Sequence, residues 1–449
     1  MQVQELRLPP AVEADHARRV ARVVRQLRER GPHAGPISLR KRAVAHQVPK
    51  ALDRRTRDRK VDIGELDRIL HIDPQRRLCV AEPGVTFVDL VEATLPHGLV
   101  PVVVPELKTI TVGGAVAGCS IESTSFHEGG FHDSCLEYEV ITAAGEVLTC
   151  RPDNELQLVF HMVHGAFGTL GILSRLTFRL MPAQPFVRVD YERHERLDSY
   201  LASIRAHRAA GDVDFMDGII HSPRLHVLSL GRFAERAPYT HRYDWMRVYW
   251  ESTGQRREDY LRTQDYFFRY DRGVTNVWPR SFVGRLLLGK LTGSTQVLGL
   301  AERLRWLLPR EQPGVTVDLF LPASRAGDFL DWHQAALGHY PLWCVPYQRR
   351  DYPWISPAYW RGVEDDLYLD IAIYGMRQRP GQNAYRLLEE KLFELDGLKS
   401  LISHNYYSED EFWSIWDRPN HQAVKALTDP QGLFRDLYAK TCRAAMGLD

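Results

Sequence analysis

Glycine and hydroxyl residues gather between Pro105 and Phe178, and they are the residues of this chain best suited to bind a nucleotide. A Thr-Val-Gly-Gly turn begins at Thr111, and a Gly-Thr-Leu-Gly run begins at Gly168. Glycine is needed where the backbone must come close to a flat or anionic group, because glycine has no Cβ atom. The pattern indicates a dinucleotide whose pyrophosphate and ring system lie against backbone N–H groups.

The predicted contacts with this cofactor fall in two regions. In the glycine region, hydroxyls and backbone N–H groups would meet phosphate oxygens, although a plain tight turn is the competing interpretation. Upstream, a strand that enters a loop carries cations suited to pyrophosphate, with surface cations as the alternative. The predicted cofactor-binding residues are Ile37, Ser38, Leu39, Arg40, Lys41, Glu106, Thr111, Val112, Gly113, Gly114, Gly118, Ser120, Ile121, Ser123, Gly168, Thr169, Gly171 and Ile172.

Length and composition describe an ordinary globular protein that is too long for one compact core. The chain has 449 residues, of which 44% are hydrophobic and 26% charged, so we expect two domains. The net charge of +1 hides a basic run between Lys41 and Lys60. Such a run favours either an anion-binding surface or a solvated loop.

Cysteine spacing and apolar runs exclude several classes of protein. None of the six cysteines forms a C-x-x-C pair or pairs with histidine at metal-ligand spacing. We therefore expect free thiols in a reducing compartment and no metal site. No run of about 18 apolar residues occurs, so we expect no membrane-spanning helix and a cytoplasmic location, with contact at the inner membrane face left open. We expect no nucleic acid partner, and the oligomeric state is left open.

Residue periodicity predicts the elements that would position the glycine region. Residues 14–30 have valines on one face and arginines around the rest, which predicts an amphipathic helix. Thr86 is suited to cap a helix that ends near Leu95. Segments 136–142 and 146–150, joined by Ala-Ala-Gly, predict a hairpin. Other predicted strands are 36–41, 78–81, 100–104 and 171–180, and a third helix is predicted at 154–163.

The second half of the chain changes in character. Residues 186 to about 400 are rich in aromatics, with strand-like segments at 315–321 and 367–374 and helical stretches between them. This pattern predicts an antiparallel sheet with helices on one face. The whole chain is therefore of the α+β class. No G-x-G-x-x-G follows a first strand, which argues against a nicotinamide-type Rossmann domain as the main cofactor site.

Several motifs, in order along the chain, resemble a known family. TVGGAVAGCSIESTSFHEGGF, DNELQLVF, YFFRYDRG, VTVDLFLP, EDEFWSIWD and LYAKTC are similar to segments of the sterol Δ24-reductases, within the vanillyl-alcohol-oxidase-like flavoproteins. The resemblance covers about residues 36 to 445. It implies an N-terminal helical segment (1–35), a two-part FAD-binding domain of the PCMH type (36–185), a substrate cap (186–400) and a C-terminal segment that returns to the FAD domain (401–449).

The resemblance also implies the chemistry. FAD would be bound non-covalently, since no residue is a clear covalent tether, and NADPH would be the reductant. The sterol enzymes carry an N-terminal membrane segment that is not seen here, so we expect a different lipid as the substrate. The favoured reaction reduces a 10-methylene fatty acyl chain to a 10-methyl branch, by hydride transfer from flavin N5 and protonation of the other carbon.

An isolated alkene is a poor hydride acceptor, so the protein must supply an acid close to the double bond. Arg269 would fix an anionic group of the substrate or reductant. A buried core tyrosine is the alternative for each phenol, and a structural ion pair is the alternative for Glu122. The candidate catalytic residues are Glu122, Tyr266, Arg269, Asp370, Tyr374 and Tyr406, with Tyr407 beside the last.

Residues 279–310 combine leucines and a tryptophan with Arg280, Arg285, Lys290, Arg303 and Arg305. Such a segment favours contact with an anionic membrane, and a cap helix packed on its own domain is the alternative. Three other functions stay open: a sterol side-chain reductase, an FAD-dependent alcohol or sugar oxidase, and a lipid-binding protein of the membrane surface without enzyme activity.

Overall fold

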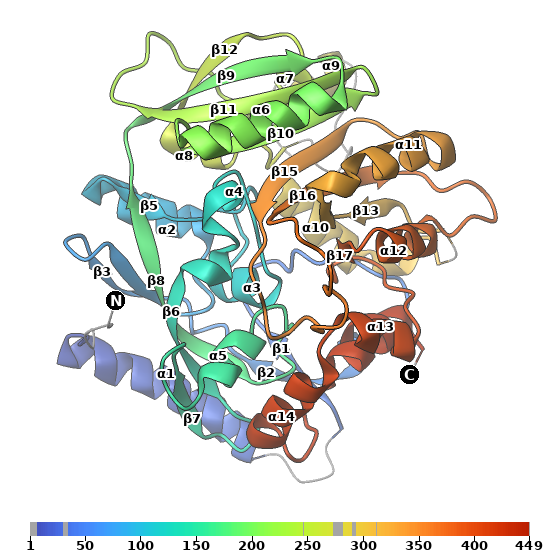
Figure 1. Ribbon diagram of the computed structural model, residues 1–449. Helices are drawn as coiled ribbons and strands as arrows, with labels where there is room; N and C mark the ends of the chain where they lie inside the picture. The colour runs from blue at the N-terminus through green and yellow to red at the C-terminus, as the bar shows by residue number, and fades with distance from the viewer. Residues whose placement is uncertain are drawn as a thin grey trace.

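The computed structural model describes residues 7–29, 35–245, 247–272, 282–289, 293–310 and 312–448. Within these residues the chain is α+β, with a six-stranded and a nine-stranded antiparallel sheet and a two-stranded parallel one (Figure 1). The smaller sheets come from the first 182 residues and the nine-stranded sheet from those that follow. The helices and sheets agree with the fold class predicted from the sequence.

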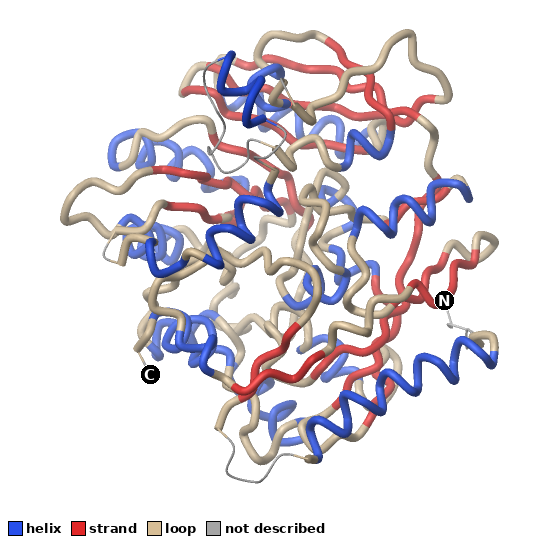
Figure 2. Tube along the Cα trace, turned by 180° about the vertical axis from the view of Figure 1, so that it is seen from behind, coloured by secondary structure: helices blue, strands red, loops and turns tan. Residues whose placement is uncertain are grey.

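Helix α1 (Pro10–Arg28) lies along the outside of the first half, as the view from behind shows (Figure 2). It begins earlier than predicted, since a proline fits the first turn of a helix, where its missing N–H is not needed. Val20, Val23 and Leu27 form its buried face and pack into a core with Ile37. This apolar stripe is the one that the sequence predicted.

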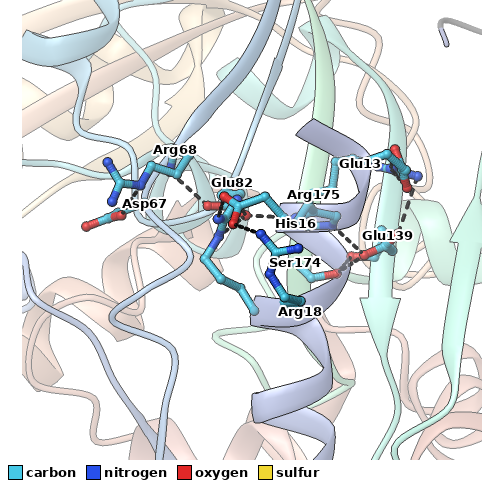
Figure 3. A network of polar contacts seen from close by, with 11 residues as sticks. Glu13, His16, Arg18, Asp67, Arg68, Glu82, Glu139, Ser174 and Arg175 are labelled. Atoms are coloured by element: carbon cyan, nitrogen blue, oxygen red, sulfur yellow. Dashed lines mark hydrogen bonds and ion pairs between the residues drawn. The ribbon is translucent and has the colours of Figure 1, made fainter. Parts of the chain in front are cut away.

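His16 joins α1 to the neighbouring sheet through two carboxylates. Its Nδ1 atom lies 2.7 Å from Oε1 of Glu82, and its Nε2 atom lies 3.0 Å from Oε1 of Glu139 (Figure 3). Arg19 also pairs with Glu82, with Nη2 2.8 Å from Oε1. Burial alone would lower the pKa of His16, but its hydrogen bonds to Glu139 and Glu82 raise the pKa to about 9. Buried ion pairs therefore attach α1 to the sheet, in addition to the apolar contacts of its buried face.

The first half contains the parallel pair and the six-stranded sheet. The parallel pair is β1 (Ile37–Arg40) with β2 (Arg59–Asp62). The β6–β7 hairpin and strand β4 lie where they were predicted. In the six-stranded sheet the strands are β3 (Ile69–Asp73), β4 (Leu78–Ala81), β8 (Ile172–Pro182), β6 (Cys135–Ile141) and β7 (Val147–Cys150), in that order, and β5 (Leu99–Pro101) pairs with β8.

Short helices link these strands. Thr86 caps α2, its hydroxyl accepting a hydrogen bond from the backbone N–H of Asp89, as predicted. Helix α5 begins later than predicted, because Oδ1 of Asn154 accepts the N–H groups of Arg151 and Leu156 and makes a turn there. The helices of this half are α2 (Phe87–Thr94), α3 (Val112–Ala117), α4 (Ser125–Glu128) and α5 (Gln157–Met162).

The nine-stranded sheet dominates the second half. Its strand pairs are all antiparallel, as predicted. The order is β12 (Glu258–Arg262), β9 (Phe186–His194), β11 (Leu225–Ala234), β10 (Phe215–Ser222), β15 (Leu342–Gln348), β16 (Leu367–Met376), β14 (Leu319–Pro322) and β17 (Leu398–Lys399), and β13 (Val315–Val317) also pairs with β16.

The two faces of this sheet are covered differently. Helices α6 (Leu197–Ala210), α11 (Ala326–Ala336) and α12 (Ala384–Glu394) share one apolar core with one face (Figure 1). The other face contributes residues such as Phe215, Trp343 and Val345 to the core of the first half. The remaining helices here are α7 (Tyr249–Thr253), α8 (Thr263–Phe267), α9 (Phe282–Leu288) and α10 (Ser294–Arg303), with a 3₁₀ turn, Arg305–Leu307, after α10.

The last part of the chain lies against the first half. Helices α13 (Glu409–Ile415) and α14 (Arg418–Thr428) lead to a π-helical turn, Ala439–Ala444. Phe434 forms a parallel bridge with Ile37, and Nη2 of Arg435 lies 2.9 Å from Oδ1 of Asp58. No described helix has the length and apolar character that crossing a membrane requires. The six cysteines are free thiols.

Two strands differ from their predicted form. The strand predicted at 315–321 is divided into β13 and β14 at Asp318. The carboxyl of Asp318 accepts a hydrogen bond from the hydroxyl of Tyr374, at 2.5 Å. The strand predicted at 100–104 ends at Pro101, although the valines that follow are buried. A run of buried valines in a loop has the same apolar sequence pattern as a buried strand, which is why the prediction was too long.

Candidate functional site

One cavity of about 600 Å³ runs between the first half and the nine-stranded sheet. Residues of the loop after β1, of α3 and of segment 162–173 line one side, and residues of β14, β15 and β16 line the other. The C-terminal segment also contributes, for example with Lys440. This volume is in the range of small-molecule and cofactor sites.

One end of the cavity combines a cation with a helix cap. Nζ of Lys41 lies 3.2 Å from Oγ1 of Thr111, and both residues line the cavity. Oγ1 of Thr111 also accepts the backbone N–H of Gly114, at 3.2 Å. Burial lowers the pKa of Lys41 to about 8, and no carboxylate among the described residues forms an ion pair with it. This end is therefore suited to bind an anion.

At two positions of the cavity wall, the space around the backbone explains why the residue is glycine. A Cβ atom on Gly114 would lie 3.0 Å from Oγ1 of Thr111 and 3.6 Å from Nζ of Lys41, inside the anion end. A Cβ atom on Gly113 would lie 2.5 Å from Cβ of Pro83, so the wall of the cavity excludes any side chain there. Gly114 keeps the anion end open, whereas Gly113 allows helix α3 to pack.

The structure brings together most of the predicted cofactor residues. The following line the cavity: Ser38, Leu39, Lys41, Glu106, Thr111, Gly113, Gly114, Gly118, Ser120, Ile121, Gly168 and Gly171. Their separate segments meet there only because the chain folds back on itself. Contact of each with a cofactor stays a prediction.

Six predicted cofactor residues do not line the cavity, contrary to the expectation. Ile37, Ile172 and Val112 are core residues, because their apolar side chains pack away from the cavity. Nη2 of Arg40 pairs with Asp62 at 2.6 Å, and this arginine is exposed. The remaining two are Ser123, whose Oγ lies 3.4 Å from the hydroxyl of Tyr266, and Thr169, whose Oγ1 donates to the carbonyl oxygen of Ala166 at 2.7 Å.

Much of the remaining cavity lining is aromatic. Trp354 stacks on Tyr352 with ring centroids 4.7 Å apart, and Trp416 stacks on Phe412 at 4.2 Å. Trp413 and Trp416 line the cavity as well as pack the C-terminal segment. Such a wall suits an apolar ligand. The aromatic lining residues are Phe167, Phe320, Trp343, Tyr347, Tyr352, Trp354, Trp360, Tyr368, Tyr374, Trp413 and Trp416.

Comparison with known proteins identifies the cofactor. Residues 10–151 match the FAD binding domain family. The human delta(24)-sterol reductase is 26% identical over 399 residues, which cover 84% of this chain and 76% of the human protein. The Arabidopsis thaliana delta(24)-sterol reductase is 24% identical over 482 residues, covering 96% and 85% of the two chains. A decaprenylphosphoryl-beta-D-ribose oxidase of Mycolicibacterium smegmatis is 36% identical over 125 residues, or 28% of this chain and 27% of the oxidase.

The chain is a delta(24)-sterol reductase-like, FAD-dependent oxidoreductase. It is an enzyme, unlike the lipid-binding protein without activity that the sequence left open. The residues of its cavity fit FAD: Lys41 would provide a cation for the pyrophosphate, and Gly114 leaves the space beside Lys41 open. The aromatic part of the lining can accommodate rings or an apolar substrate.

Three of the predicted catalytic residues of this oxidoreductase form a closed cluster instead of lining the cavity. Nη2 of Arg269 lies 3.2 Å from Oε1 of Glu122 and 3.0 Å from Oδ1 of Asp217. The guanidinium carbon lies 4.0 Å from the ring centroid of Tyr266. All four side chains are buried, so Arg269 is not placed to bind an anionic group of a substrate. The sequence missed Asp217, since only the fold brings β10 to Arg269.

Asp370 and Tyr374 do line the cavity, and two further carboxyls lie there with them. Asp318, which the sequence did not single out, accepts a hydrogen bond from Tyr374, and Glu106 was predicted only as a cofactor ligand. Oδ1 of Asp370 accepts the backbone N–H of Leu319 at 3.0 Å. The flavoenzyme thus has three acidic residues on the cavity wall, which we call the acidic group. They are Glu106 from the loop before α3, Asp318 between β13 and β14, and Asp370 on β16.

The other candidates lie elsewhere or have local partners. Tyr406 does not line the cavity, and its backbone N–H donates to Glu389 at 2.9 Å. Tyr407 is buried behind it, among aromatic residues of α13. Two histidines of the glycine region, which were not candidates, differ in position: His132 lines the cavity and is buried, with Nε2 3.4 Å from Oδ2 of Asp133, whereas His127 is exposed.

Proposed function

We propose that this enzyme reduces a carbon–carbon double bond of a lipid, and that the lipid is a 10-methylene fatty acyl chain, which becomes a 10-methyl branch. A sterol with an unsaturated side chain, the substrate that the names of the relatives indicate, is the closest alternative within this proposal. The observation that carries the proposal is the cavity, whose lining combines the cation of Lys41 with aromatic side chains and with the carboxyls of Glu106, Asp318 and Asp370.

FAD, when bound, supplies a hydride for the double bond. The protein binds and orients: Lys41 and Thr111 hold the pyrophosphate, and the aromatic wall at Trp343, Tyr347 and Phe320 excludes water and packs on the acyl chain. An exomethylene group develops positive charge at its substituted carbon when it is protonated, and aromatic faces stabilise such charge. A carboxylic acid of the cavity wall holds the proton that the other carbon needs.

Three further points belong to this proposal. The FAD-binding part has the two-subdomain PCMH arrangement, residues 186–400 form the substrate cap, and the C-terminal segment completes the FAD domain. NADPH is the electron donor and uses the same cavity in turn with the lipid, since no separate nicotinamide fingerprint occurs in the sequence. The enzyme acts in the cytoplasm, at the inner face of the membrane.

Helix α10 and the turn after it form the proposed contact with an anionic bilayer. Leu300 is 59% exposed, Trp306 67% and Leu307 61%, with the exposed Arg303 among them. Leu298 and Glu302, on the same helix, line the cavity. An apolar surface with arginines fits the headgroup layer of an anionic membrane, and this one adjoins the cavity. Of the basic residues predicted for this contact, Arg280 and Lys290 and the side chain of Arg285 lie outside the described residues.

The experiment that tests the function is mass spectrometry of fatty acids from cells that express this chain beside an enzyme that makes methylene-branched lipids. We expect loss of the methylene species and gain of the methyl-branched species. The matched control is the Lys41→Ala variant in the same cells. Unchanged methylene lipids, with FAD-loaded protein present, would remove this substrate from the proposal.

Oxidation of an alcohol or sugar is the second candidate. The local similarity to the decaprenylphosphoryl-beta-D-ribose oxidase favours it, because the 36% identity over 125 residues is higher than the 26% and 24% identities over the longer reductase alignments. Peroxide formed in air with an alcohol substrate, and no reduction of an alkene, would favour the oxidase over the reductase.

A further inference from the structure

Among the acidic residues on the cavity wall, Glu106 has no hydrogen-bond partner in another described residue, neither side chain nor backbone. The carboxyl of Glu106 lines the cavity and is 9% exposed, yet no hydrogen bond or ion pair joins it to another side chain of the described residues. Asp318, by contrast, accepts from Tyr374, and Asp370 accepts from the backbone N–H of Leu319. The carboxyl of Glu106 is therefore available to a ligand in the cavity, whereas Asp318 and Asp370 each already accept one hydrogen bond from another residue.

We propose that Glu106 is the acid that protonates the substrate double bond, and that Asp318 is a positioning residue that keeps it in the acid form. This inference rests on the proposed function and names a catalytic residue for it. Glu106 lies next to Pro105 in the loop before α3, whereas Asp318 lies between β13 and β14 and Asp370 lies on β16, so the acid and its neighbours come from separate parts of the fold and line the same cavity.

The step balances as a two-electron reduction. A hydride adds to one alkene carbon, and the O–H bond of Glu106 breaks as the second carbon forms its new C–H bond. Glu106 is left as a carboxylate and regains a proton from water. The hydride derives from a reduced nicotinamide dinucleotide, by way of FAD.

The surroundings of Glu106 keep it protonated at neutral pH. Burial contributes most to raising the pKa of Glu106 to about 8. The charges of Glu122 and Asp318 also raise this pKa, whereas the charge of Arg269 lowers it. Burial raises the pKa of Asp318 to about 6, and burial with the charge of Asp318 raises that of Asp370. Tyr374 also faces this group and is held protonated, since burial and the carboxyls raise its pKa. An ionised Asp318 beside a protonated Glu106 is the expected state at pH 7.

The Glu106→Gln variant tests the proposal, because it keeps the size of the side chain but cannot donate a carboxyl proton. We expect normal binding of FAD and normal reduction of FAD by NADPH, with reoxidation by the lipid slowed about 100-fold. The exposed Glu146→Gln variant, in the turn of the β6–β7 hairpin, is the matched control and should reoxidise like the wild type.

Two readouts separate a proton donor from a structural residue. The lipid-dependent step of the wild type should slow as the pH rises through about 8, and in Asp318→Asn this break should move to lower pH, because a like charge is lost. Infrared difference spectra between pH 6 and pH 9 should show a protonated carboxyl that is missing in Glu106→Gln, with or without FAD. Lipid reduction at the wild-type rate in Glu106→Gln would overturn the proposal for Glu106 and leave the reductase function standing. Failure of the wild type to reduce any alkene would instead remove the proposed function.

Discussion

Nζ of Lys41 lies 3.2 Å from Oγ1 of Thr111, so a cation from the loop after β1 meets the cap of α3 across a separation of 70 residues. This pair forms the anion end of the cavity, and no described carboxylate forms an ion pair with Lys41. We therefore expect the pyrophosphate of FAD to take the place of the missing counter-charge.

Replacing Lys41 with alanine should weaken the binding of FAD at least tenfold, since a hydrogen bond to a charged group contributes about 1.5–3 kcal/mol. Titration of the FAD-free protein, followed by quenching of flavin fluorescence, measures the dissociation constant. Arg40→Ala is the matched control, because Arg40 pairs with Asp62 and does not line the cavity. Equal losses in both variants would contradict the anion end described here.

His16 should make the stability of the protein depend on pH. Its pKa is about 9 in the folded state, above its ordinary value of 6.5, because of Glu139 and Glu82. The stabilisation is therefore complete below about pH 6.5 and is lost as the pH rises through about 9, with a size on the order of 3 kcal/mol.

Urea unfolding at pH 6.5 and pH 9.5 checks this effect. The free energy of unfolding of the wild type should fall more between these two values than that of His16→Gln, which has no imidazole to deprotonate. Parallel curves for the two proteins would show that the imidazole is not charged in the fold.

Arg269 should contribute to stability and not to substrate binding. Arg269→Leu leaves the carboxyls of Glu122 and Asp217 buried without a counter-charge, and breaking such a buried pair costs about 3–5 kcal/mol. Chemical denaturation of the FAD-loaded protein measures this loss. The exposed Arg196→Leu should change stability by less than about 0.5 kcal/mol. A stable Arg269→Leu variant with a raised KM for the lipid would restore the role of substrate anchor.

Charge on α10 and the turn after it should control binding to anionic vesicles. We expect co-sedimentation with vesicles that contain phosphatidylglycerol, and weaker binding after Arg303→Glu with Arg305→Glu, because the new carboxylates are repelled by the headgroups. Arg196→Glu with Arg205→Glu, on α6, is the control of equal charge and should bind like the wild type. Undiminished binding of the α10 variant would exclude this surface as the membrane contact.

Local signals in the sequence predicted the elements well. Thr86 caps α2, the β6–β7 hairpin lies where its strands and turn were predicted, and α1 buries its valines. Each of these signals depends on neighbours along the chain, such as a capping hydroxyl or helical spacing. The glycine region was also identified, and most of its predicted residues line the cavity.

The acidic group could not be predicted, because only tertiary contacts bring it together. Asp318 stood inside an apparent single strand, and its bond to Tyr374 of β16 joins residues 56 apart. Glu122 and Arg269 were predicted as catalytic residues, but they form a buried ion pair, the alternative given for Glu122, and their common partner Asp217 lies on β10. The periodicity of apolar residues predicts which face of a helix or strand is buried. It does not predict which residues of other elements that face will contact.

The most direct test of the account is the spectrum of the purified protein without oxygen. Protein reconstituted with FAD should show flavin absorption, lose it on reduction by NADPH, and regain it when a 10-methylene fatty acyl lipid is added, with one methyl-branched product per flavin. A protein that cannot be loaded with FAD, or whose reduced flavin is reoxidised by oxygen but never by the lipid, would contradict the account.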